Sequence, residues 1–133
     1  MLSFNREKCV YCKLCENVCS FRFTQQVRPS VAAIRIGREG KWGLPSARIC
    51  DLCKDLEEGP KCVAACPEDA LGVSDGGVIA WDDEKCTRCE VCVDVCPNKA
   101  VAYDTDSDRI ILCDLCGGKP LCIEWCPEQV ISA

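Results

Sequence analysis

Four cysteine runs constrain the fold of this chain more than any other feature. They are CVYCKLCENVC (9–19), CDLCKDLEEGPKCVAAC (50–66), CTRCEVCVDVC (86–96) and CDLCGGKPLCIEWC (113–126). The first and third have the spacing C-x2-C-x2-C-x3-C, whereas the second and fourth widen the middle gap to eight and five residues. All four runs end with C-x3-C, so they are repeats of one motif.

These runs contain all 16 cysteines of the 133-residue chain, which has no histidine. Disulfides suit secreted proteins, and structural zinc is typically bound by two separated C-x2-C pairs. Here three close cysteines precede a fourth, the ferredoxin pattern in which the fourth cysteine binds a neighbouring 4Fe–4S cluster. The pattern favours 4Fe–4S clusters over zinc or disulfides, and sixteen ligands supply four clusters.

Short helices and hairpins are expected between the runs. Because proline is tolerated at the first helical position, PEDALGV after Cys66 and PNKAVAY after Cys96 predict a helix that begins at each fourth cysteine. The positive end of that helix would then face an anionic cluster. LGVSDGGVIAW, VAYDTDSDRIILC and IRIGREGKWGL predict hairpins, the last with Gly37 and Gly40 in its turn. Modules of about 60 residues are marginal without metal, so the iron-free chain should be largely unfolded.

Several functions are disfavoured by what the sequence lacks. The net charge is −5, no apolar stretch precedes Cys9, and no run of about 18 apolar residues occurs. We therefore expect a cytoplasmic protein with no membrane partner and no nucleic-acid partner. Gly37, Gly40 and Gly43 do not form a G-x-G-x-x-G loop, and no cysteine is spare for nucleophilic chemistry. The chain is expected to conduct electrons and not to be an enzyme itself.

The alternation of compact and expanded runs resembles the four-cluster electron-transfer subunits of molybdopterin and tungstopterin oxidoreductases. The resemblance implies an α+β fold of two nested bacterial 2[4Fe–4S] ferredoxin-like modules with short hairpins and short helices. The outer module would comprise residues 1–49 plus 98–133, including the 20–49 connection. The inner module would comprise residues 50–97.

The same resemblance implies a ligand set for each of the four clusters. Carried over by position, the sets are Cys9, Cys12, Cys15 and Cys126; Cys113, Cys116, Cys122 and Cys19; Cys50, Cys53, Cys62 and Cys96; and Cys86, Cys89, Cys92 and Cys66. Spacing alone also permits adjacent pairing, the first run with the second and the third with the fourth.

One run departs from the others, because Cys19 is followed by serine and not by proline. CENVCSF followed by VRPSVAAIRI is similar to the small subunits of tungsten aldehyde oxidoreductases, although Arg28-Pro29 replaces Asn-Pro and no histidine follows Phe21. This resemblance implies a tungstopterin or molybdopterin catalytic subunit as partner, in anaerobic metabolism. A flavin subunit that meets NAD, or a ferredoxin, would complete the complex, and the sequence leaves the identity of the electron acceptor open. The alternatives are a free-standing diffusible polyferredoxin and an iron–sulfur sensor or cluster donor.

Some side chains outside the ligand set have two readings. Positive charge in the long connection gathers at Arg28, Arg35, Arg38 and Lys41. With Trp42, these residues fit a partner-docking surface, but charged hairpin faces are more often simply solvated. Tyr11 and Trp125 lie between ligands and fit either shielding of a cluster or, more commonly, ordinary packing.

Overall fold

The protein, described over residues 2–133 by a computed structural model, consists of short helices and four two-stranded antiparallel sheets. The helices are α1 (Leu14–Thr24), α2 (Lys61–Ala65), α3 (Val91–Val95) and α4 (Leu121–Glu124), with 3-10 turns η1 (Pro29–Val31) and η2 (Leu115–Gly118). The strands are β1 (Ser3–Phe4), β2 (Arg35–Arg38), β3 (Pro45–Arg48), β4 (Leu71–Val73), β5 (Ile79–Trp81), β6 (Ala102–Asp104), β7 (Arg109–Ile111) and β8 (Ile131–Ser132). The predicted α+β class is confirmed.

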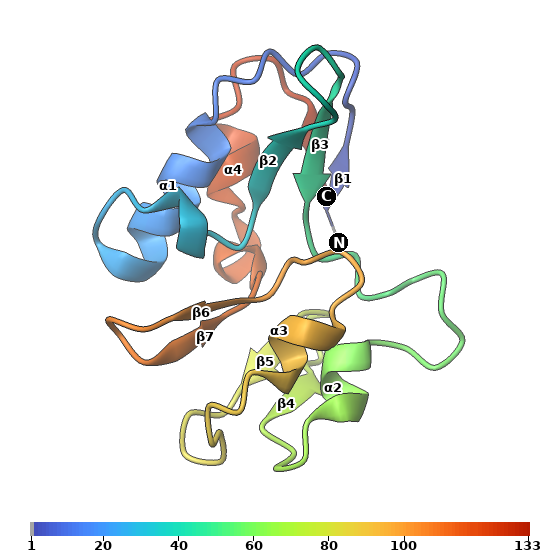
Figure 1. The fold of residues 1–133 in the computed structure, drawn as a ribbon, viewed down its shortest axis with the longest axis vertical. Coiled ribbons are helices and arrows are strands. Elements are labelled where there is room, and N and C mark those ends of the chain that lie inside the picture. The colour runs from blue at the N-terminus through green and yellow to red at the C-terminus, as the bar shows by residue number, and fades with distance from the viewer. Residues whose placement is uncertain (1) are drawn as a thin grey trace.

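The β6–β7 hairpin lies between two halves of the molecule, one with α1, α4, β2 and β3 and the other with α2, α3, β4 and β5 (Figure 1). Each half has its own buried cluster, and the hairpin contributes to both. Ala102 and Ile111 pack in the first half, whereas Val101 and Ile110 pack in the second. Successive strand residues point to opposite faces, so the hairpin is a wall shared by the two halves. The module boundaries at 49/50 and 97/98 stay a prediction.

The prediction that helices begin at the fourth cysteine of a run is wrong. α2 and α3 end just before Cys66 and Cys96, which have extended backbone (φ −69°, ψ 114° and φ −65°, ψ 116°). A residue before proline is disfavoured in the helical region, so the Cys-Pro step stops the helix. Where Ser20 replaces proline, α1 continues through Cys19 and reaches a total length of 11 residues. The missing proline therefore explains why the first helix is the long one.

The three hairpins predicted between the runs are present as β2–β3, β4–β5 and β6–β7. Gly37 is an exception, because it lies within β2 opposite Ser46 and not in the turn. The pairing of β1 with β8 was not predicted. It joins the two ends of the described chain, and two-residue strands carry too little alternation to be recognised in a sequence.

The long connection is tied to the β6–β7 hairpin by buried polar groups. The Arg28 guanidinium donates to the buried Asp104 carboxylate at 3.0 Å, and Ser107 Oγ donates to the same carboxylate at 2.6 Å. The backbone N–H of Arg28 donates to Oγ of Ser20 at 3.0 Å, and Ser20 is fully buried. Thus the serine that replaces proline also anchors the segment that α1 leads into.

In the part of the chain that the structure describes, no helix has the length and apolarity needed to span a bilayer.

Candidate metal centres

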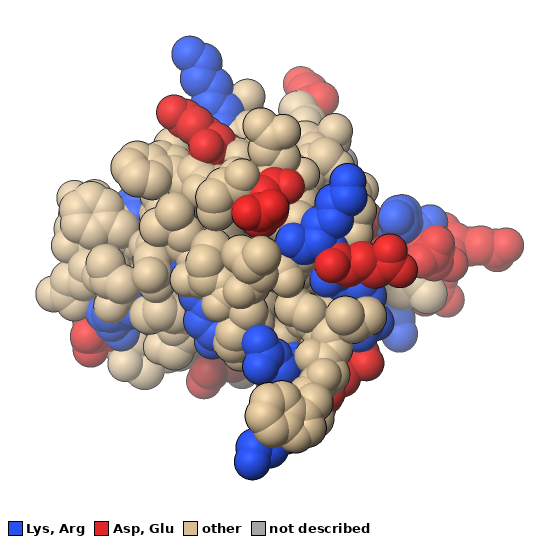
Figure 2. All heavy atoms as spheres, turned by 90° about the horizontal axis from the view of Figure 1, so that it is seen from above, with Lys and Arg blue, Asp and Glu red and all other residues tan. Residues whose placement is uncertain are grey.

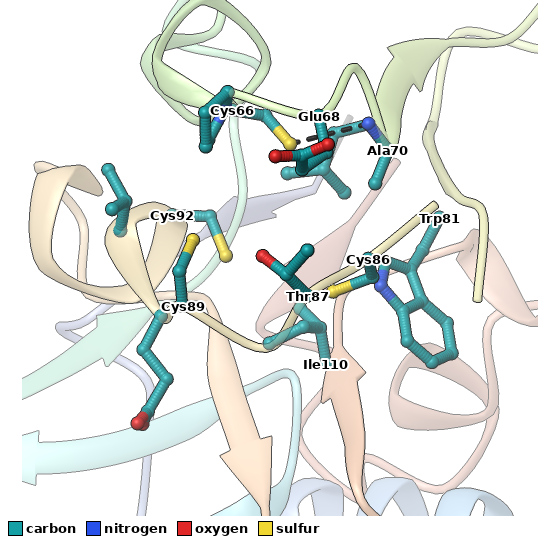
Figure 3. Close-up of a pocket in the computed structure, with 13 residues that line it drawn as sticks. Cys66, Glu68, Ala70, Trp81, Cys86, Thr87, Cys89, Cys92 and Ile110 are labelled. Atoms are coloured by element: carbon teal, nitrogen blue, oxygen red, sulfur yellow. Dashed lines mark hydrogen bonds between the residues drawn. The ribbon is translucent and has the colours of Figure 1, made fainter. Parts of the chain in front are cut away.

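The sixteen cysteines line four hollows, four cysteines in each. Hollow 1 has Cys9, Cys12, Cys15 and Cys126; hollow 2 has Cys19, Cys113, Cys116 and Cys122; hollow 3 has Cys50, Cys53, Cys62 and Cys96; hollow 4 has Cys66, Cys86, Cys89 and Cys92. Each hollow has about 320–350 Å³ of atom-free space, partly open to solvent. Within residues 2–133, no three Cys, Asp or Glu side chains converge as a single metal ion would require. In hollow 4 the four sulfurs face a common space (Figure 3).

The ligand loops share an unusual backbone. In the compact runs, Tyr11 and Lys13 have φ of 60° and 62°, and their equivalents Arg88 and Glu90 have φ of 59° and 62°. In the expanded runs, Leu52 and Leu115 are also left-handed. Left-handed backbone at a non-glycine residue costs on the order of 1–3 kcal/mol and persists only where the surroundings demand it. Its recurrence at equivalent positions indicates that the loops are shaped around a common bound group.

The third cysteine of every run is the second residue of a helix. Cys15, Cys62, Cys92 and Cys122 occupy this place in α1, α2, α3 and α4. Backbone N–H groups in the first turn of a helix have no intrahelical partner. The helix end that favours negative charge therefore lies at the third cysteine of each run, and not at the fourth as predicted.

The fourth cysteine of each run accepts a backbone N–H at its sulfur. Ala70, Ala100 and Val130 donate to Cys66, Cys96 and Cys126, each four residues earlier, at 3.3, 3.3 and 3.5 Å. Cys19 lies inside a helix and cannot use this turn. Ala33, from the long connection, donates to its sulfur at 3.3 Å instead. The same N–H···S contact is thus made by a different segment.

Burial keeps the most enclosed of these thiols protonated in the absence of metal. It raises the pKa of Cys15, Cys62 and Cys122 from 9.0 to about 12, partly opposed at Cys15 by the N–H of Glu16. A bound metal cation reverses this preference, because thiolates are the ligands and binding releases their protons. Four thiols, backbone N–H groups directed at sulfur and an apolar wall fit a 4Fe–4S cluster in each hollow.

The hollows follow one another in a row. Hollows 1 and 2 share α1, which carries Cys15 and Cys19, and the neighbouring residues Leu112 and Cys113 line hollows 3 and 2. Hollows 3 and 4 are joined by α2 and α3, because each helix carries a ligand of one hollow and is followed at once by a ligand of the other. Cys12 in hollow 1 and Cys89 in hollow 4 are exposed, whereas every cysteine of hollows 2 and 3 is buried or half-buried. The two ends of the row are thus the hollows most open to a partner.

Two of the four cations considered for docking, Arg28 and Arg35, make contacts within the chain. Arg28 pairs with Asp104 and Asp106, and Arg35 donates to the carbonyl groups of Lys99 and Val101. Arg38 and Lys41 remain exposed. Basic and acidic side chains are interspersed over the face shown in Figure 2. Of the four cations, Arg38 and Lys41 are thus the two without such contacts to the β6–β7 hairpin region.

Of the two aromatic side chains between ligands, Tyr11 packs against the core of its half as the commoner interpretation expects, whereas Trp125 is largely exposed. Trp125 is 52% exposed, and the Tyr11 ring packs between Lys13 and Arg38, with cation-to-centroid distances of 4.9 and 4.3 Å. Sequence reasoning missed Trp81, which lines hollow 4. Its spacing of five residues before Cys86, the same as that of Phe4 before Cys9, was the available signal.

Two family models match the chain. A 4Fe-4S dicluster domain matches residues 49–100, and a 4Fe-4S binding domain matches residues 2–22. In solved structures, the active-site complex BamBC of benzoyl coenzyme A reductase with benzoyl-CoA contains a similar chain, with a TM-score of 0.55 and 21% identity. That likeness covers 99% of this chain and 76% of the other, and it supports the fold.

Curated relatives extend over almost the whole sequence. The aliphatic sulfonate oxidoreductase polyferredoxin-like subunit of Pyrococcus furiosus is 35% identical, over 92% of this chain and 68% of that protein. NADH-dependent phenylglyoxylate dehydrogenase subunit beta of Aromatoleum evansii is 35% identical over 98% of this chain, which spans only 29% of that protein. The matching polypeptide of anaerobic dimethyl sulfoxide reductase from Escherichia coli is 29% identical, over 94% of this chain and 68% of that protein. The chain therefore belongs to the family of 4Fe–4S ferredoxin-like electron-transfer subunits of oxidoreductase complexes and binds multiple 4Fe–4S clusters.

Proposed function

We propose that this chain relays single electrons along four 4Fe–4S clusters, between a tungstopterin or molybdopterin catalytic subunit of the aldehyde-oxidoreductase type and a redox acceptor. The observation that carries the proposal is the grouping of all sixteen cysteines into four hollows with four ligands each. When bound, each cluster would accept and release one electron. The nested ligand sets and the modules 1–49 plus 98–133 and 50–97 belong to this proposal.

The chain's own residues hold the ligands in place. N–H···S contacts from Ala33, Ala70, Ala100 and Val130 stabilise negative charge at one ligand of each hollow. Exposed Cys12 and Cys89 make hollows 1 and 4 the points of exchange with partners. The ordered row between them supports a conductor with an entry and an exit.

Exposed apolar side chains favour a subunit of a stable complex over a freely diffusing polyferredoxin. Trp42 is 87% exposed, and Val10, in the ligand loop of hollow 1, is 61% exposed. Exposed aromatic and aliphatic side chains near an exchange point fit a surface that a partner covers. A cytoplasmic location is part of the proposal, since many free thiols belong to a reducing compartment.

Anaerobic purification from the native host, with metal analysis of each co-eluting protein, tests this function. We expect a large subunit that contains tungsten or molybdenum. Isolation of the chain alone, with iron and no heavier metal, would favour the diffusible polyferredoxin instead. The substitution Trp42→Ala should weaken the complex, whereas Lys54→Ala, at an exposed site beside hollow 3, should leave it intact.

A further inference from the structure

Trp81 has a hydrogen-bond donor that nothing in the described chain satisfies. Trp81 is the last residue of β5, and its side chain lines hollow 4 (Figure 3). Its Nε1 atom is buried and finds no hydrogen-bond partner within residues 2–133. An indole N–H can only donate, and a buried donor left unpaired costs about 1–3 kcal/mol. An acceptor inside the hollow would remove that cost.

The indole ring is held rigidly against the ligand loop. The guanidinium groups of Arg88 and Arg109 lie over it, at 5.5 and 5.7 Å from the ring centroid. Nη1 of Arg88 also donates to the carbonyl of Cys86 at 2.6 Å, which ties this stacked group to a ligand of hollow 4. In Figure 3 the nitrogen edge of the ring faces Cys86. The donor is therefore directed toward the cysteine side of the hollow.

Hollow 1, at the other end of the row, contains a natural comparison. Phe4 pairs with Ile131 as Trp81 pairs with Leu71, and both aromatic residues precede the first ligand of their run by five positions. The next residue donates its N–H across the sheet at 2.8 Å in both cases, from Asn5 to Val130 and from Asp82 to Ala70. Phe4 also lines hollow 1. Equivalent backbones thus present a donor at one end and a plain hydrocarbon ring at the other.

We propose that the indole N–H of Trp81 donates to a sulfur held in hollow 4, and so makes a cluster there easier to reduce than it would be beside a hydrocarbon ring such as that of Phe4. The inference rests on the proposed occupancy of the hollows. A hydrogen bond to a cluster sulfur stabilises the reduced, more negative state. Phe4 offers no donor, so hollow 1 lacks this contribution.

The test is a redox titration of the holoprotein, monitored by electron paramagnetic resonance, for the wild type and Trp81→Phe. Loss of one hydrogen bond of about 1 kcal/mol should shift one reduction equilibrium roughly three- to tenfold. At 59 mV per tenfold for one electron, one midpoint should fall by about 30–60 mV. Trp125→Phe is the control, since Trp125 is half exposed and does not line a hollow; its midpoints should be unchanged.

Replacement of Trp81 by its benzothienyl analogue removes only the N–H and keeps the ring shape. It should lower the same midpoint while the iron content stays at the wild-type value. Unchanged midpoints in this protein with full iron content would overturn the role of Trp81 and leave the proposed function intact. Wild-type protein that binds no iron at Cys86, Cys89 and Cys92 would overturn both.

Discussion

The buried ion pair between Arg28 and Asp104 allows a quantitative test of how the long connection is held. Nη2 of Arg28 lies 3.0 Å from Oδ1 of Asp104. The Asp104 side chain is 1% exposed, and that of Arg28 is 26% exposed. Burial acts to raise the pKa of the Asp104 carboxyl, but hydrogen bonds from Ser107 and Arg28 outweigh it and hold the pKa below its usual value. The carboxylate is therefore charged, and Asp104→Asn would leave the guanidinium without its buried partner.

The stability that Asp104→Asn should lose can be bounded. Removing one partner of a fully buried pair costs about 3–5 kcal/mol. Because Arg28 is partly exposed and keeps Asp106 at 3.3 Å, we expect about 2–3 kcal/mol for Asp104→Asn. Asp106→Asn is the matched control: its carboxylate contacts the same guanidinium but is 72% exposed. That change should cost about 0–1 kcal/mol.

Iron release to a chelator, measured anaerobically by the loss of cluster absorbance, is the assay. Arg28 precedes η1 and Ala33, whose N–H donates to Cys19, so loosening this segment exposes hollow 2. If iron leaves from a briefly opened state, 2–3 kcal/mol corresponds to a release roughly 30- to 150-fold faster. Equal rates for Asp104→Asn and Asp106→Asn would refute the reasoning.

Three further predictions follow from the fold and the thiols. Ser20→Pro should destabilise α1 by about 3 kcal/mol, because proline inside a helix removes an N–H and clashes with the preceding turn; far-UV circular dichroism should show the loss, and an equal loss in Pro97→Ser, which lies beyond a helix end, would contradict it. Removal of all iron should abolish cooperative thermal unfolding, since the hydrophobic clusters of two such small halves are marginal without metal; a native-like transition of the iron-free chain would refute this. Because burial raises the pKa of Cys62 and Cys122 from 9.0 to about 12, packing that survives in the iron-free chain is present below pH 9 and is lost as the pH rises toward 12. Tryptophan fluorescence measures that loss of packing, and a gain of structure over the same pH range would contradict the prediction.

The sequence was most informative where the thiol spacing leaves few geometric options. The repeated runs predicted iron–sulfur chemistry and the α+β class, because ligand loops and the hairpins between them follow from local spacing. The helices were misplaced in the prediction because a Cys-Pro step can mark either the start or the end of a helix. Proline can open a helix, but it also disfavours helical backbone at the preceding residue, and here the second effect acts at Cys66 and Cys96.

Contacts between distant segments were beyond prediction. The N–H of Ala33 reaches Cys19 across 14 positions, and Arg28 reaches Asp104 across 76. A charge in a sequence does not reveal whether an acid will lie beside it, so Arg28 and Arg35 resembled docking residues until the fold was known. The equal spacing of Trp81 and Phe4 before the first ligand was visible in the sequence, but the strand pairing that places both rings beside a hollow is set by tertiary contacts.

Iron and acid-labile sulfide analysis of anaerobically purified holoprotein tests the central claim most directly. Four clusters predict about sixteen irons and sixteen sulfides per chain. Cys126→Ser should perturb the cluster of Cys9, Cys12 and Cys15, whereas Cys66→Ser should perturb that of Cys86, Cys89 and Cys92. About eight irons in the wild type, or perturbation of the first run's cluster by Cys66→Ser, would contradict the four-hollow account.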